Sequence, residues 1–152
     1  MKEKTKKKIL LVLLCAVTLL ILFAAIRLNA NRKNSMLSSS LIKGYLSEIK
    51  YEEIITHVKE QPNTVVYVSD SSDEKSMDFE KKFIKVVKKY NLENEIIYIN
   101  INGVTIVDPL YQNAPELVFY KNGEMSDLID CTTMKSTSVI IEKLKERSVI
   151  ND

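Results

Sequence analysis

Few side chains in this sequence could carry out catalytic chemistry. The 152 residues include two cysteines and one histidine. Cys15 lies in an apolar stretch near the N-terminus, and Cys131 is the one cysteine of the remaining chain. His57 has no cysteine, aspartate or serine at motif spacing, and we expect it at the surface or boundary of a helix. Because Cys131 is alone after the apolar stretch and there is a single histidine, the sequence predicts no disulfide within the domain and no Cys/His metal site. We also expect no cofactor and no catalytic residue.

Cys131 has two interpretations. Buried cysteine behaves as a small hydrophobic residue, and this is the role we expect. The alternative is a one-cysteine thiol transferase, which requires an exposed thiol with a lowered pKa. The nearest downstream cation is Lys135.

The polar turn at residues 69–76 is the most distinctive candidate for a binding role. It follows the apolar run Val65–Val68 and precedes an amphipathic segment. Ser71 and Glu74 have the spacing of a capping box, and Asp73 adds negative charge at the positive end of the helix dipole. The turn therefore predicts a helix start. Because it is exposed, contact with a partner is the alternative.

Hydrophobic periodicity predicts the elements that position this turn. We expect strands at 64–68, 96–101, 116–120 and 125–130, and helices from Ser47 or Tyr51 to about 60, at 73–90 and at 136–147. Residues 102–114 contain Gly103 and Pro109 and show no helical stripe, so we expect no full helix there. A strand–helix–strand unit requires a parallel crossover, and the last two strands form an antiparallel hairpin. The fold class is therefore α/β, a mixed sheet with helices on both faces.

The helix predicted at 73–90 has two faces. The apolar stripe consists of Phe79, Phe83, Val86, Val87 and Tyr90. The face expected to be solvated carries Lys81, Lys82, Lys85, Lys88 and Lys89, with Asp78 and Glu80 between them.

This layout resembles the thioredoxin superfamily. The strand, turn and helix are followed by a proline-led hairpin, Ala114–Glu124, with the sequence APELVFYKNGE. In a working thioredoxin the turn carries Cys-x-x-Cys, and the matching positions here are Asp73 and Ser76. The resemblance implies a thioredoxin-like fold, a cis Ala114–Pro115 peptide bond facing the turn, and Cys131 at the base of the domain.

The resemblance also implies a groove between the turn and the proline loop, where extended peptide pairs with backbone and needs no cysteine. Its predicted members are Ser72, Asp73, Glu74, Ser76, Ala114, Pro115 and Glu116. Within the superfamily, residues 45–147 look most similar to the bacteriocin transport accessory proteins of Gram-positive bacteria. Those relatives commonly carry Cys-x-x-Cys, so we expect the fold and a role beside an export system, without the redox activity.

The N-terminal region predicts a membrane anchor. Residues 9–26 are eighteen positions without a charge, long enough for one transmembrane helix through a bilayer core of about 30 Å. Residues 1–8 contain five lysines, which favours a cytoplasmic N-terminus and a domain outside the cell membrane. A cleaved signal peptide is the alternative. We expect a juxtamembrane linker at 27–44 and the domain at 45–152.

Charge and chemistry together predict a binding protein. The chain has a net charge of +2, but from residue 31 onward acidic residues outnumber basic ones by three, so no nucleic-acid partner is expected. We expect a single-pass, redox-inactive accessory module that holds an exported or membrane protein or peptide. The alternatives are thiol chemistry at Cys131 and a structural spacer in a membrane assembly. The partner and the oligomeric state stay open.

Overall fold

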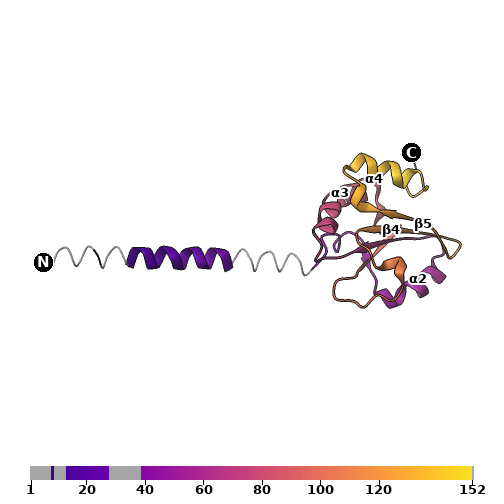
Figure 1. The fold of residues 1–152 in the computed structure, drawn as a ribbon. Coiled ribbons are helices and arrows are strands. Elements are labelled where there is room, and N and C mark those ends of the chain that lie inside the picture. The colour runs from indigo at the N-terminus through magenta and orange to yellow at the C-terminus, as the bar shows by residue number, and fades with distance from the viewer. Residues whose placement is uncertain (1–7, 9–12, 28–38, 152) are drawn as a thin grey trace. The chain divides into compact units, whose positions relative to one another are not determined.

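The computed structural model describes residues 8, 13–27 and 39–151, which belong to two compact units, Met1–Met36 and Leu37–Asp152 (Figure 1). In the first unit, residues 13–27 are helical and their side chains are exposed. Within the described ranges, no helix has both the length and the apolar character needed to cross a bilayer. Residues 9–12 of the predicted span, all of the predicted segment 1–8 except Lys8, and residues 28–38 of the predicted linker lie outside those ranges.

The second unit is built on a five-stranded mixed sheet. In sequence order the strands are β1 (Ser47–Glu48), β2 (Val65–Ser69), β3 (Ile96–Asn100), β4 (Glu116–Lys121) and β5 (Glu124–Asp130). Their order across the sheet is β1-β3-β2-β4-β5. β3 pairs in parallel with β1 and β2, whereas β4 pairs antiparallel with β2 and β5. This arrangement confirms the predicted crossover and hairpin.

Helices cover both faces of the sheet, as predicted. They are α2 (Ile54–Glu60), α3 (Glu74–Tyr90) and α4 (Thr137–Lys145). Successive strand residues point to opposite faces. One core contains Tyr67, Tyr98 and Leu117 from the strands with Phe79, Phe83 and Ile140 from α3 and α4. The other contains Val66, Val68 and Val118 with Ile54 and Val58 of α2. Figure 1 shows α3 and α4 on one side of the sheet and α2 on the other.

The start of the domain differs from the prediction in two ways. Ser47 and Glu48 form β1 instead of opening a helix, and Ile49 N–H donates to the Tyr98 carbonyl at 3.0 Å. Pairing with β3 thus overrides the helical spacing of the local sequence. The second expected start is confirmed, because a 3₁₀ turn at Tyr51–Glu53 leads into α2.

The last part of the predicted linker belongs to the packed domain. Ile42 is 0% exposed and lies in the core beneath α3, and Ser40 is also buried. The domain therefore begins before Tyr45. The serine-rich sequence suggested a flexible tether, but the Ser40 hydroxyl donates a hydrogen bond to the buried carboxylate of Glu80, forty positions away.

The segment between β3 and β4 contains no full helix, as expected. Its one helical element is a 3₁₀ turn at Pro109–Tyr111, which Asp108 caps by accepting a hydrogen bond from Leu110 N–H. Tyr111 packs into the core on the α2 face.

Candidate functional site

The turn after β2 and the proline loop lie at the same edge of the sheet. β2 and β4 are antiparallel, and Val68 of β2 is paired with Glu116, the first residue of β4. The residues after Ser69 and those before Glu116 therefore leave the sheet at one end. The Ala114–Pro115 peptide bond is cis, as the resemblance implied. The structure thus brings together the two segments that the sequence assigned to a groove.

The turn is held by its own short polar side chains. Asp70 Oδ1 accepts hydrogen bonds from the Ser72 backbone N–H at 2.8 Å and from its hydroxyl at 2.6 Å. Asp73 is the N-cap of α3 and accepts from Ser76 N–H at 3.3 Å. Ser76 is buried, and its hydroxyl accepts from Asp70 N–H at 3.3 Å. These contacts close the turn over the first residues of the helix.

The predicted capping box of Ser71 and Glu74 is wrong. Ser71 is 1% exposed, and its hydroxyl accepts hydrogen bonds from the side-chain amides of Asn100 and Asn102, each at 3.0 Å. These tertiary contacts engage Ser71 at the end of β3, so Asp73 caps the helix two residues later. The physical role that the sequence indicated, a capped helix start, is nevertheless present.

The predicted groove residues differ in their accessibility. Ser72 and Glu74 are exposed, Asp73 and Ala114 are half-buried, and Ser76, Pro115 and Glu116 are buried. Asn113, at the start of the proline loop, is exposed. The surface that a partner can reach is therefore made by Ser72, Asp73, Glu74, Asn113 and Ala114.

Glu116 occupies an unfavourable position for a charge. It is 7% exposed, and its Oε2 has no hydrogen-bond partner among the described residues. Burial and the facing carboxylate of Asp130 raise the pKa of Glu116, against a smaller lowering by a hydrogen bond from Asn113. By contrast, hydrogen bonds from Thr132 lower the pKa of Asp130. The two facing carboxyl groups thus differ in how readily they ionise.

Cys131 lies beside the proline loop and not at the base of the domain. Its backbone N–H donates to the Pro115 carbonyl at 2.9 Å. The expectation failed because β5 runs antiparallel to β4, so the chain returns to the edge where β4 begins. The thiol is 1% exposed, and burial followed by the charges of Asp130 and Glu116 raises its pKa well above the ordinary value. The predicted small buried hydrophobic residue agrees with this geometry.

Glu80 is the polar residue that sequence reasoning missed. It was expected on the solvated face of α3, but it is 1% exposed. Its Oε1 accepts from the hydroxyls of Ser40 (2.6 Å), Ser69 (2.6 Å) and Tyr67 (3.2 Å). Its Oε2 accepts from the backbone N–H groups of Leu41 (2.7 Å) and Ile42 (3.2 Å). Helical spacing was the available signal, because Glu80 lies four residues after Ser76 and three before Phe83, within the buried stripe.

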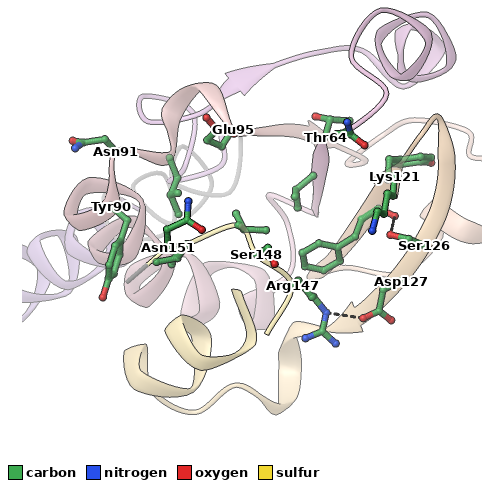
Figure 2. Close-up of a pocket in the computed structure, with 17 residues that line it drawn as sticks. Thr64, Tyr90, Asn91, Glu95, Lys121, Ser126, Asp127, Arg147, Ser148 and Asn151 are labelled. Atoms are coloured by element: carbon green, nitrogen blue, oxygen red, sulfur yellow. Dashed lines mark hydrogen bonds and ion pairs between the residues drawn. The ribbon is translucent and has the colours of Figure 1, made fainter. Parts of the chain in front are cut away.

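Two pockets lie outside the predicted groove. A pocket of about 710 Å³ lies at the opposite end of β2 and β4, where Figure 2 shows the ion pair of Arg147 and Asp127, at 2.6 Å. A second pocket of about 570 Å³ lies between residues 48–53 and the end of β3. Neither is lined by the predicted groove residues. Within the described part of the chain, no group of three or more His, Cys, Asp or Glu side chains is placed to hold a metal ion.

Comparison with solved structures identifies the fold. Mitochondrial thioredoxin 3 from Saccharomyces cerevisiae, in its oxidized form, is 10% identical, with a TM-score of 0.51. The likeness covers 66% of this chain and 94% of that chain. The chain has the thioredoxin fold. "A putative oxidoreductase with a thioredoxin fold" is 13% identical over 66% of this chain and 95% of that chain, with a TM-score of 0.47. No protein-family model matches the sequence, and no curated protein matches it.

The likeness to mitochondrial thioredoxin 3, at 10% identity, establishes the fold and not an activity. Residues 69–76 of the thioredoxin-fold domain contain no cysteine, and the one cysteine of the domain is buried beside the proline loop. The turn carries hydrogen-bonding side chains and the negative charges of Asp70, Asp73 and Glu74.

Proposed function

We propose that the chain is a membrane-anchored thioredoxin-fold binding protein that carries out no thiol–disulfide exchange. It holds an extended segment of an exported or membrane protein against the turn at residues 70–74 and the proline loop at 113–115. The observation that carries the proposal is the meeting of these two segments at one sheet edge, with a cis Ala114–Pro115 bond and no cysteine in either segment.

The polar groups of the turn suit binding better than catalysis. Asp73 is engaged as a helix cap and the Ser76 hydroxyl is buried in a hydrogen bond, so neither is free to act as a nucleophile. Ser72, Glu74 and Asn113 are exposed, and Ala114 is half-buried. Backbone pairing beside such a proline supplies affinity without any reactive side chain.

The thiol-transfer alternative requires properties that Cys131 lacks. A reactive thiol is exposed and ionises easily, because the thiolate is the nucleophile. Cys131 is buried, and its surroundings raise its pKa. These features favour the binding role over one-cysteine chemistry.

Membrane attachment through residues 9–26 forms part of the proposal. The supporting observations are eighteen uncharged positions after five lysines, and a helix at 13–27 whose apolar side chains, such as Leu20 and Phe23, are exposed. Exposed apolar side chains of this number are unfavourable in water and favourable in lipid. We expect the full chain to stay in the membrane fraction after alkaline carbonate extraction. A tag after Asp152 should be digested by protease added outside intact cells.

The partner that we propose is a peptide passing through an export system, such as a bacteriocin. The support is the resemblance of residues 45–147, and the hairpin sequence in particular, to the accessory proteins of such systems. Because those relatives commonly act through a cysteine pair, the role that we propose is holding or guiding the peptide.

Site-specific photocrosslinking in cells tests the binding role. Photoreactive residues at exposed Ser72 and Asn113 of the full-length protein should give a discrete crosslinked partner. A probe at exposed Lys85, on the solvated face of α3, is the matched control. The proposal is wrong if Lys85 crosslinks a partner while neither groove position does. The function would then lie on the lysine-bearing face of α3.

A further inference from the structure

The most unusual feature of the domain is a buried carboxylate that joins three parts of the chain. Glu80 belongs to α3, Tyr67 and Ser69 to β2, and Ser40, Leu41 and Ile42 to the leading segment, which we define as residues 39–46. All five donors to Glu80 are neutral hydroxyl or backbone groups at 2.6–3.2 Å. A carboxylate offers about four lone-pair sites, so its capacity is filled.

We propose that Glu80 is a positioning residue for the candidate groove and couples the order of the turn at 70–73 to the docking of the leading segment. The turn is the connection between β2 and α3. Ser69, the last residue of β2, donates its hydroxyl to the Glu80 carboxylate on α3 at 2.6 Å. This hydrogen bond links the strand before the turn to the helix after it. The same carboxylate holds the leading segment.

The docked leading segment supplies most of the hydrogen bonds to the Glu80 carboxylate. Three of the five donors come from residues 40–42, and Ser69 Oγ lies 3.2 Å from Ser40 Oγ. A buried charge is tolerated when its hydrogen-bonding capacity is satisfied and is costly when it is not. Removal of the segment would leave the carboxylate with Tyr67 and Ser69 alone. Undocking therefore favours movement of α3 or entry of water at the foot of the turn.

Other contacts keep the leading segment docked in the resting state. Ile42 is in the core, Lys43 pairs with Glu48 at 3.2 Å, and the Lys88 ammonium lies 4.4 Å from the Tyr45 ring centroid. The segment directly follows residues 28–38, through which the chain continues from the N-terminal unit. A pulling force transmitted along the polypeptide from the N-terminal unit must therefore act on the leading segment before it acts on the sheet.

The regulatory part of the inference rests on the proposed binding function. If the groove holds a partner, an undocked leading segment loosens one wall of the groove and weakens binding. Docking of the segment and occupation of the groove then favour each other, as linkage requires of two sites with a coupling free energy.

Hydrogen exchange of the full-length chain in detergent micelles tests the coupling. Ser40→Ala removes one donor of the leading segment and leaves the carboxylate in place. We expect roughly ten- to hundredfold faster exchange at Leu41 and Ile42 and also at residues 70–73, from the usual contribution of hydrogen bonds to a charged group. The β4–β5 hairpin should be unchanged. The matched control is Asp78→Asn, an exposed residue of the same helix, which should alter neither region.

The conservative variant distinguishes positioning from simple packing. Glu80→Leu should accelerate exchange in both regions. Glu80→Gln should restore protection, because its amide oxygen can accept from the two backbone groups and its NH₂ can donate to the hydroxyls. Where Glu80→Leu does not fold, Ser40→Ala decides alone. Faster exchange at residues 41–42 with unchanged exchange at 70–73 would overturn the coupling, and so would no change in either region.

Crosslinking separates this inference from the proposed function. With the probe at Ser72, Ser40→Ala should reduce the yield of the partner adduct several-fold, whereas Asp78→Asn should leave it unchanged. A wild-type protein that gives no adduct at Ser72 or Asn113 counts against the binding function, while hydrogen exchange still decides the coupling. An unaltered adduct yield in Ser40→Ala would overturn the regulatory part.

Discussion

The stability of Glu80 variants provides the sharpest prediction, because two large effects of opposite sign compete at this residue. Replacement by leucine removes a buried charge, which is favourable in itself. It also leaves the backbone N–H groups of Leu41 and Ile42 without their acceptor. A buried donor left unsatisfied costs about 1–3 kcal/mol. The three hydroxyls can partly bond to one another, so the two amides dominate the estimate.

We expect the lost acceptors to outweigh the relief of the charge. For Glu80→Leu the two amides contribute about 2–6 kcal/mol, and partial relief of charge burial leaves a net loss of about 3 kcal/mol. For Glu80→Gln an oxygen remains for both amides, so the loss should be about 1 kcal/mol, the difference between charged and neutral hydrogen bonds. The free energy of unfolding of small domains is about 5–15 kcal/mol, so the Glu80→Leu variant should still fold but be less stable.

Urea unfolding of the full chain in micelles measures both variants. Tyrosine fluorescence or far-ultraviolet circular dichroism is suitable, because the chain has seven tyrosines and no tryptophan. If the free energy of unfolding falls by about 1.5 kcal/mol per M urea, the urea midpoint should be about 2 M lower for Glu80→Leu and about 0.7 M lower for Glu80→Gln than for the wild type. Asp78→Asn on the same helix is the control and should change little. A leucine variant as stable as the glutamine variant, or more stable, would refute the reasoning and show that burial of the charge dominates.

Three further results are expected. Alkylation of Cys131 should be at least about a hundredfold slower in the native protein than in urea, because its thiol is buried and its pKa is raised; equal rates would contradict its burial. Glu116 has a raised pKa in the folded state, so its contribution to stability is full below the ordinary glutamate pKa and is lost as pH rises through the raised value. Glu116→Gln should therefore gain stability relative to wild type from pH 4 to 7 in urea titrations, and a constant difference would argue against the shift. Asp73→Ala should lower the free energy of unfolding by about 1 kcal/mol through loss of the helix cap, and no change in the urea midpoint would mean that Ser71 caps the helix after all.

The elements with strong periodicity could be predicted from sequence. The stripe of α3, the apolar run of β2 and the Asn-Gly hairpin between β4 and β5 are local patterns that encode one element each, and their bounds agree with the structure to within about two residues. The order of these elements then restricts the topology, because parallel crossovers have one hand.

Elements that depend on distant partners could not be predicted. β1 is two residues long, and its strand conformation comes from pairing with Ile97 and Tyr98, about fifty positions away. Ser40 belongs to the domain because a carboxylate forty positions away accepts its hydrogen bond. Such segments lack enough local periodicity to outweigh the pattern of their own neighbours.

The sequence by itself determined the absence of cysteine from the turn and the presence of a proline before β4, since both are properties of residue type. It also determined that a polar turn would follow a buried strand and open a helix. Tertiary structure alone decided which of these residues a partner can touch. Antiparallel return of β5 placed Cys131 beside Pro115, and pairing with the end of β3 buried Ser71. A carboxylate on a lysine-rich helix became the centre of a buried network because its donors came from two other parts of the chain, residues 40–42 and β2. Hydrogen-bond satisfaction depends on all donors and acceptors around a group, and only the folded chain brings them together.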